Sequence, residues 1–168
     1  MMKVGTVVRY GQVGLCCVEE IRAMAMNGTT QDYYVLSPLF KQGSVLYVPM
    51  ENKELVGRMC LPLTVEEAEA LLEQVKDVET EWNRDFRRRS EQFKKALASS
   101  DRRDVLLLLK TIYDHKREGS DGKKIHTADD YYLKDAENLI FSEIAYIRKT
   151  EVQVVAREIR VALGYEEE

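Results

Sequence analysis

The sequence predicts an α+β protein of two domains, a small β-barrel followed by a compact all-helical domain. Up to about residue 60 the chain has short runs of β-branched and aromatic residues separated by glycine-containing turns. Beyond residue 63 the apolar residues recur at helical spacing to the end of the chain. Because the stretch Cys60-Leu-Pro-Leu-Thr64 separates the two patterns, we expect domains of residues 1–60 and 64–165.

The N-terminal part is predicted to form four main strands joined by tight turns. Asn27-Gly28 supplies the positive φ angles that a two-residue hairpin turn needs. Pro49 cannot donate to a strand ladder, so the strand before it should end there or lie at a sheet edge. Short strands at this spacing are typical of an SH3-like or Tudor-like barrel. The expected strands are Val4–Tyr10, Leu15–Ile21, Tyr33–Leu36 and Val45–Val48.

The C-terminal part is predicted to contain about five helices packed as a bundle. Thr64-Val-Glu-Glu67 has the spacing of a capping box, which marks the start of the first helix. The next helix should cover residues 81–98, with Trp82, Phe86 and Phe93 on one face. The other predicted boundaries are a break and cap at Ser99–Asp101, a turn at Gly119–Gly122, capping boxes that begin at Thr127 and Thr150, and a closing Gly164.

The composition is that of a folded soluble protein, and it excludes several classes. Among the 168 residues, no apolar run approaches the roughly 18 residues of a membrane span. The N-terminal Met-Met-Lys-Val-Gly has no apolar signal core, so we expect a cytoplasmic protein with no membrane contact. Cys16 and Cys17 are adjacent and Cys60 is alone, which indicates neither a disulfide framework nor a metal site. The cysteine pair is best explained as small buried residues of a strand.

No catalytic motif stands out, and we expect no catalytic residue, metal or cofactor. His115 and His126 have no nucleophile or metal partner near them in the sequence. The simplest explanation is a solvated histidine, or one that complements a helix dipole. A small enzyme with its site at the junction of the two domains stays an alternative, although the polar triad or metal cluster that it needs is absent from the sequence.

One basic window stands out in a chain whose net charge is −4. Residues 81–103 hold 8 basic and 4 acidic residues, whereas residues 64–80 hold 1 basic and 6 acidic residues. The window opens with the only tryptophan, Trp82, and Arg84, Arg87, Arg88 and Arg89 follow. Arginine binds phosphate bidentately, and an aromatic side chain can stack on a base or wedge between base steps. The competing interpretation is that Trp82 is a core residue and the arginines are a solvated helix face.

Several stretches, taken in order, resemble the CarD/CdnL family of bacterial transcription regulators. The N-terminal part looks like the RNA-polymerase-interacting module that this family shares with the transcription-repair coupling factor. The matching stretches are Gly5-Thr-Val-Val-Arg-Tyr10, Gly14, Tyr33-Tyr-Val-Leu36, Tyr47-Val-Pro-Met-Glu-Asn52, Val56-Gly-Arg58, Trp82-Asn-Arg84, the Phe86–Leu97 helix and the Ala98-Ser-Ser-Asp101 break.

This resemblance implies a function and its site residues. The barrel would bind the β subunit of RNA polymerase by adding strand to strand at a sheet edge. The helical domain would lie on double-stranded promoter DNA at the upstream edge of the transcription bubble and stabilise the open complex. Trp82 matches the family's wedge into the minor groove, and Arg84 and Arg87 match positions that contact the DNA backbone. We add Arg88 because it lies in the same cluster.

The sequence also departs from the family, and one further function stays open. Some members carry arginines in the second-strand hairpin and the fourth strand, where this chain has Arg22-Ala-Met-Ala-Met-Asn-Gly28 and Tyr47. We therefore expect a more apolar polymerase contact, through Met24, Met26 and the strand residues Val45 and Tyr47. Tyr47 can equally be a cross-strand packing residue. The alternative function is a nucleic-acid-binding module that acts without polymerase. We expect a monomer, associated with the nucleoid through polymerase.

Overall fold

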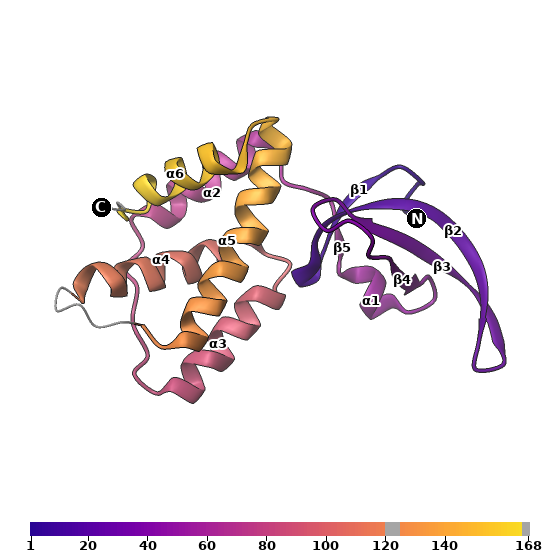
Figure 1. Cartoon of the computed structure of the whole chain (residues 1–168), viewed down its shortest axis with the longest axis horizontal. Coiled ribbons are helices and arrows are strands. Elements are labelled where there is room, and N and C mark those ends of the chain that lie inside the picture. The colour runs from indigo at the N-terminus through magenta and orange to yellow at the C-terminus, as the bar shows by residue number, and fades with distance from the viewer. Residues whose placement is uncertain (120–124, 166–168) are drawn as a thin grey trace. The chain divides into compact units, whose positions relative to one another are not determined.

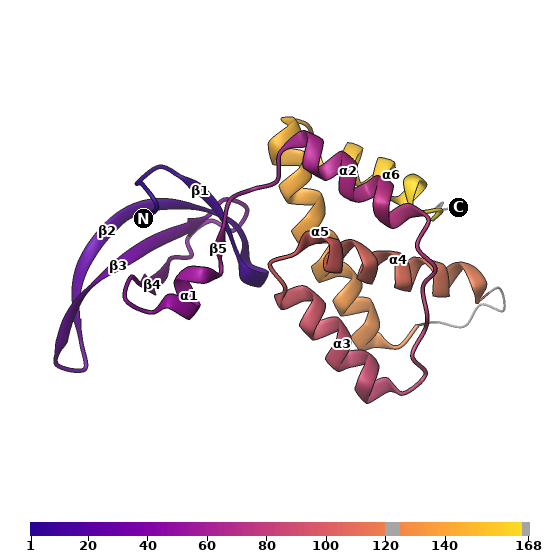
Figure 2. The same ribbon diagram turned by 180° about the vertical axis from the view of Figure 1, so that it is seen from behind.

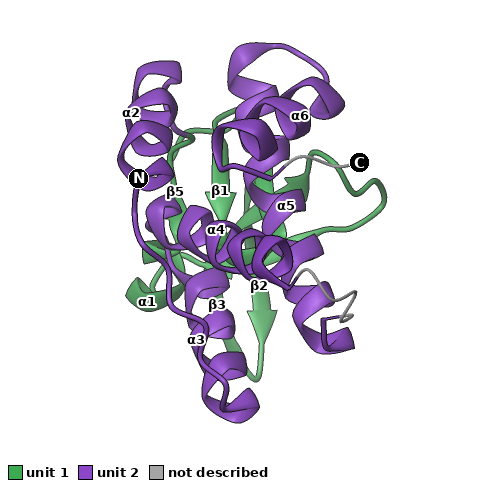
Figure 3. Ribbon diagram, turned by 90° about the vertical axis from the view of Figure 1, so that its left-hand side faces the viewer, with its two compact units in different colours: residues 1–62 green, residues 63–168 purple. Residues whose placement is uncertain are grey.

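The computed structural model describes residues 1–119 and 125–165 of the chain. These divide into two compact units, Met1–Pro62 and Leu63–Glu168 (Figure 3). The first unit holds a β-sheet and the second is helical, so the predicted α+β class is confirmed. Each unit has its own cluster of buried apolar residues.

The first unit is a five-stranded antiparallel sheet in the order β4-β3-β2-β1-β5 (Figure 1). A 3₁₀ turn, Gly11–Val13, joins β1 to β2, and a short helix α1, Lys53–Gly57, precedes β5. The strands are β1 (Val7–Tyr10), β2 (Gly14–Met26), β3 (Thr29–Pro38), β4 (Leu46–Pro49) and β5 (Met59–Cys60).

The sheet is open, so the predicted closed barrel is not what the structure shows. β4 and β5 lie at opposite edges, and within residues 1–119 and 125–165 no ladder joins them. These edge strands have only four and two residues, which limits the main chain that could close the ring. A register shift between Val18 and Glu20 interrupts the long β2–β3 ladder, and a β-bulge of this kind increases local twist.

The turn between β2 and β3 has the predicted conformation. Asn27 and Gly28 have φ angles of 52° and 79°, and the flanking Met26 and Thr29 pair directly. Two central residues with positive φ define the hairpin turn that matches strand twist. The β2–β3 hairpin extends beyond the ends of β1 and β4 as a two-stranded arm (Figures 1 and 2).

One face of this sheet carries the core of the first unit. Cys16 is fully buried there, as expected, and burial raises the pKa of its thiol to about 11, whereas Cys17, also predicted to be buried, is only half-buried. A thiol with so high a pKa is a poor nucleophile at neutral pH. The cluster consists of Val8, Cys16, Val18, Tyr34, Leu36, Val48 and Met59.

The second unit contains, within its described residues, the five predicted helices. The capping box at Thr64 is confirmed, since its side chain accepts from the Glu67 amide and the Glu67 carboxylate accepts from the Thr64 amide. Asp101 caps α4 as predicted, and Gly164, with φ 76°, follows α6. The helices are α2 (Val65–Lys76), α3 (Phe86–Ala98), α4 (Arg102–Glu118), α5 (Thr127–Arg148) and α6 (Val152–Ala162).

Three predicted helix starts were wrong. Helix α3 begins at Phe86 rather than near residue 81, because the Asp85 side chain accepts from the amides of Arg87 and Arg88 and caps the helix there. At α5 the cap is His126, whose Nδ1 accepts from the Ala128 amide, and Thr127 is already helical.

The start of α6 also differs from the prediction. Thr150 follows Lys149, the C-cap of α5, and its amide donates to the Ala145 carbonyl, while Glu151 precedes α6 without a side-chain cap. The predicted turn after α4 is present at Gly119, which is its C-cap, and residues 120–122 lie outside the described residues.

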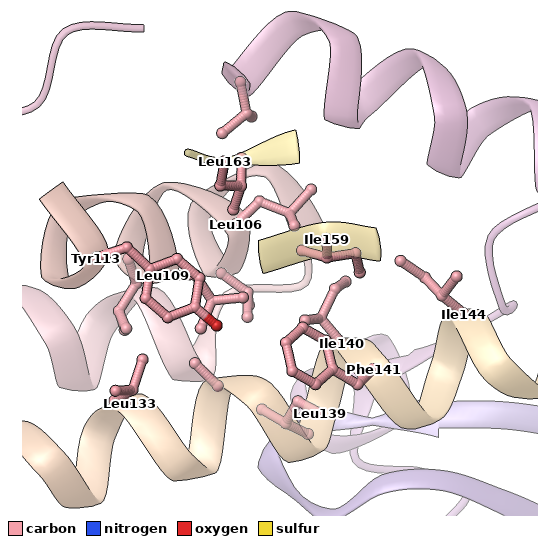
Figure 4. Packing of buried hydrophobic residues seen from close by; sticks show 14 of the residues in the cluster. Leu106, Leu109, Tyr113, Leu133, Leu139, Ile140, Phe141, Ile144, Ile159 and Leu163 are labelled. Atoms are coloured by element: carbon pink, nitrogen blue, oxygen red, sulfur yellow. The ribbon is translucent and has the colours of Figure 1, made fainter. Parts of the chain in front are cut away.

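The core of the second unit forms where α4 and α5 pack together and α2, α3 and α6 pack against them (Figure 4). Leu109 and Ile112 of α4 are fully buried, in agreement with the central position predicted for this helix. Three acidic residues of α5 add polar links, each to a cation of a different helix. These pairs are Asp129 with Arg89 of α3, Glu137 with Arg160 of α6, and Glu143 with Arg102 of α4.

Candidate nucleic-acid and polymerase interfaces

Trp82 lies in the irregular segment that leads into α3, and the neighbouring helices hold this segment on both sides. Thr80 donates a hydrogen bond of 2.7 Å to Asp114 of α4, and Arg89 of α3 donates one of 2.9 Å to the Asn83 carbonyl. The segment between these two anchors carries Trp82. The tryptophan side chain therefore has a defined place beside α3 and α4 although it is not in a helix.

The Trp82 side chain is half-buried and contacts both polar and apolar side chains. The indole stacks on the His115 ring with 3.6 Å between centroids and 4° between planes. The Arg89 guanidinium carbon lies 4.6 Å from the indole centroid, and the Phe93 ring lies 6.0 Å away in a tilted contact. Trp82 thus packs against the core without being one of its fully buried residues.

Sequence reasoning missed the role of His115. Its position on α4 follows Leu108 and Ile112 at helical spacing, so its periodicity was the signal that places it on the inner face. Burial, and then the positive charge of Arg89, lower the pKa of His115. The neutral imidazole is therefore the favoured form of the ring that stacks on Trp82.

His126 also has a structural role that was not foreseen. Besides capping α5, its ring lies 4.2 Å from the Phe86 ring at the start of α3. This contact joins the beginnings of two helices that are far apart in the sequence. In the described part of the chain, no cluster of three or more metal-ligating side chains includes either histidine.

The three predicted DNA-binding arginines are exposed. The side chain of Arg87 is 90% exposed and that of Arg88 is 78% exposed. Each forms one long, exposed ion pair, with Arg87 Nε 3.9 Å from Glu91 and Arg88 Nε 3.8 Å from Asp85. Arg84 is also exposed. Long, exposed ion pairs contribute little, so these cations are available to an anionic partner.

Two other arginines of the basic window are structural. Arg89 is 6% exposed and binds Asp129 with two hydrogen bonds, of 3.0 and 2.8 Å. Arg102 is 8% exposed and binds Glu143 through Nε at 2.9 Å. Both carboxylates lie outside the window, so its accessible positive charge is smaller than the sequence count suggests.

A surface pocket lies beside Trp82. Its volume is about 460 Å³, and Trp82 and Arg84 both line it. The structure thus brings the predicted wedge and one predicted phosphate contact to one site. A second, more open groove of about 810 Å³ lies between α3 and α4 and shares Glu81 and Gln92 with the pocket. The remaining lining residues of the pocket are Glu81, Asn83 and Gln92.

Strand β4 has one edge that pairs with no other strand among residues 1–119 and 125–165. Its other edge pairs with β3, where Val48 faces Tyr34 and Tyr47 faces Val35. The Met50 amide donates to the Asp32 carbonyl at 2.9 Å, which makes this a hydrogen-bonded pair. Because hydrogen-bonded pairs alternate along an antiparallel ladder, the main-chain N–H and C=O of Tyr47 point away from β3.

Three of the four predicted polymerase-binding residues share one face of the sheet. Tyr47 is 43% exposed, and alternation places it opposite the core-facing Leu46 and Val48, whereas Val45, 49% exposed, precedes β4, which begins at Leu46 rather than at the predicted Val45. The register places Met24 opposite Gln31 and Met26 opposite Thr29, on the same face as Val35, which is opposite Tyr47.

The structure separates these four residues into two pairs. Met24 faces a β3 residue four positions away from the one that Tyr47 faces, which is about 13 Å along the strand. Met26 accepts a hydrogen bond of 3.2 Å from the Tyr33 hydroxyl, so the arm side chain is held against β3. A partner strand along β4 would meet Val45 and Tyr47 first, and the methionines only if it extended along the arm.

No helix within the described residues is long and apolar enough to cross a membrane. Residues 2–60 match the family model of the CarD-like/TRCF RID domain, so the first unit carries a CarD-like RID domain. This match covers the sheet and α1 and ends before the helical unit begins. A comparison of the chain with curated proteins gave no match.

Proposed function

We propose that this protein is a transcription regulator that joins RNA polymerase to promoter DNA. Its first unit binds the polymerase β subunit, and its helical unit contacts the upstream edge of the transcription bubble and stabilises the open complex. The match of residues 2–60 to the CarD-like/TRCF RID domain carries this proposal. The proposal includes no catalytic step.

The polymerase contact in this proposal is a strand added to β4. The outward N–H and C=O groups of Tyr47 supply main-chain hydrogen bonds, and the exposed Val45 and Tyr47 side chains supply selectivity. Substitutions at Tyr47 separate the two contributions. Tyr47→Ala removes the side chain alone, whereas Tyr47→Pro also removes the outward N–H, and the ladder with β3 does not use that N–H.

We expect Tyr47→Pro to weaken binding of the full chain to the β subunit clearly more than Tyr47→Ala, as measured by calorimetry after nuclease treatment. Val154→Ala is a control, because Val154 is 43% exposed on α6 of the other unit. Equal binding by the proline variant and the parent, with both folded, would contradict strand addition at β4.

The DNA contact in this proposal uses Trp82, Arg84, Arg87 and Arg88. The exposed arginines supply phosphate contacts, and Trp82 meets the DNA where stacking is already broken. An interaction offered only by the opened promoter favours the open state, which is how binding shifts that equilibrium. Open-complex lifetime with and without the protein is the measurement, and Trp82→Ala and Arg84→Ala should both shorten it.

A second candidate function is nucleic-acid binding without polymerase, and the exposed arginines before and within α3 favour it. The two functions separate in a pull-down from nuclease-treated extract. Retention of the β subunit supports the main proposal, and its loss together with full binding to DNA supports the second.

A further inference from the structure

The way Trp82 is held limits how it can meet DNA. His115 lies parallel to the indole at 3.6 Å and covers one of its faces, and the Arg89 guanidinium lies 4.6 Å from the ring centroid. A base cannot stack on the face that His115 covers. What Trp82 offers to a partner is the part of its side chain that lines the pocket of about 460 Å³.

The pocket has the volume of a ligand site, and its lining is mostly polar, with Trp82 as its aromatic member. Such sites are commonly about 300–1,000 Å³ with a few convergent polar groups. Gln92 brings an amide with both donor and acceptor atoms, and Glu81 brings acceptors. The Asn83 Oδ1 accepts from the Asp85 amide, which leaves its NH₂ group as the donor that it can offer.

Cations flank the pocket along α3. Arg88, Gln92 and Lys95 follow at i, i+4 and i+7, so they share one face of the helix. Arg88 and Lys95 are separated by about 10 Å of helix rise, with Gln92 between them. Arg84 adds a positive charge at the pocket itself. A nucleic-acid strand along this face would meet cations at its phosphates on both sides of Gln92.

We propose that this pocket binds an unpaired nucleobase of the melted promoter strand, with Gln92 and Asn83 hydrogen-bonded to its Watson–Crick edge. Trp82 forms a wall of the pocket, and Arg84, Arg88 and Lys95 bind the adjoining phosphates. The base is unpaired because a paired base has already engaged that edge. This inference rests on the proposed function, in which promoter DNA lies against Trp82.

Trp82 is the only tryptophan, so fluorescence excited at the red edge of indole absorption, where the nine tyrosines absorb little, reports on the surroundings of Trp82. The probes are a short single-stranded oligodeoxynucleotide of mixed sequence and a strand of equal length built from abasic residues. We expect the first to change Trp82 fluorescence saturably, and the second to give a much weaker response at the same concentration. An equal response to both strands would overturn the base pocket.

Gln92→Ala should lower the affinity for the oligodeoxynucleotide about 2- to 10-fold, since it removes hydrogen bonds to the base and leaves the cations in place. Gln74→Ala is the matched control, because Gln74 is an exposed glutamine of α2 outside the pocket. Equal affinities for the two variants would also overturn the inference.

The same variants in the polymerase open complex separate this inference from the proposed function. If Gln92→Ala and Trp82→Ala both shorten the lifetime and Gln74→Ala does not, both are supported. If Trp82→Ala and Arg84→Ala shorten it but Gln92→Ala matches Gln74→Ala, the base pocket fails and the proposed function stands. If none of them changes the lifetime, the proposed function fails.

Discussion

The two units of this protein expose their candidate contact surfaces in different ways. In the sheet unit the candidate surface is the main chain of β4, whose unpaired groups exist because β4 is an edge strand. In the helical unit the candidate surface consists of side chains around the start of α3, and ion pairs to α5 keep Arg89 and Arg102 buried. A contact made by the main chain of an edge strand tolerates substitution of the side chains. A contact made by side chains of the helical unit depends on which arginines are exposed.

Arg87 and Arg89 show this division within one helix. Arg87 is 90% exposed, while Arg89 is 6% exposed and is bound to Asp129, which is fully buried. The two side chains have the same chemistry and lie two residues apart. Their different roles follow from the orientation of α3 relative to α5, which composition does not encode.

The largest expected effect is the loss of stability on breaking the buried pair. Arg89→Ala leaves the Asp129 carboxylate buried without its cation, and we expect the free energy of unfolding to fall by about 3–5 kcal/mol. Denaturant titration followed by circular dichroism measures this. Arg87→Ala is the control and should stay within about 0.5 kcal/mol of the parent. Equal stability of the two variants would remove the distinction between them.

Sequence patterns were most informative where a feature is local. The Asn27-Gly28 turn, the capping box at Thr64 and the five helices follow from short-range spacing, and the structure confirms them. Closure of the sheet into a barrel depends on the lengths of β4 and β5 and on their distance in space. The sequence pattern did not contain that information.

The candidate site shows the same limit. Periodicity put Trp82 and Phe93 on one face, and their rings do contact, although Trp82 precedes the helix. The His115 stack and the pocket at Gln92 bring together residues of different elements. Their partners are set by packing, so residue type and spacing could not identify them.

The next effect in size concerns Trp82 itself. Because it is half-buried and packs on His115 and Phe93, Trp82→Ala should cost about 2–3 kcal/mol of stability, less than the 3–5 kcal/mol typical of a fully buried aromatic residue. A wedge with no packing role would instead leave the melting temperature near that of the parent. Thermal unfolding measures it, with Phe40→Ala as a control because Phe40 is 58% exposed. A loss as large as that of Arg89→Ala would mark Trp82 as a core residue.

A smaller effect should follow from the pH dependence of His115. Its pKa is lowered in the folded protein by burial and by Arg89, with Asp129 and Glu118 acting in the opposite direction. As the pH falls below about 6.5, the unfolded chain takes up this proton first, so stability present at higher pH is lost.

We therefore expect the parent to lose more stability than His115→Phe between about pH 7.5 and about pH 5.5. Phenylalanine keeps an aromatic ring against Trp82 without a titrating group. The difference between the two proteins, obtained from denaturant titrations at each pH, isolates this histidine from the carboxylates that both share. Parallel pH curves would show that His115 has the same pKa in the folded and unfolded states.

The smallest expected effects separate the exposed arginines from one another by their response to salt. Each phosphate contact releases about one counterion, so the slope of log affinity against log salt should flatten by at most about one unit in each of Arg84→Ala, Arg87→Ala and Arg88→Ala. The measurement is binding of the polymerase–protein complex to promoter DNA at several salt concentrations, because the acidic remainder of the chain weakens binding to free duplex.

Arg157→Ala on α6 is the control, since Arg157 is exposed but lies outside the α3 region. Among the three, Arg84→Ala should flatten the slope most, because Arg84 lines the pocket together with Trp82. An unchanged slope in all three variants would place the DNA elsewhere on the helical unit.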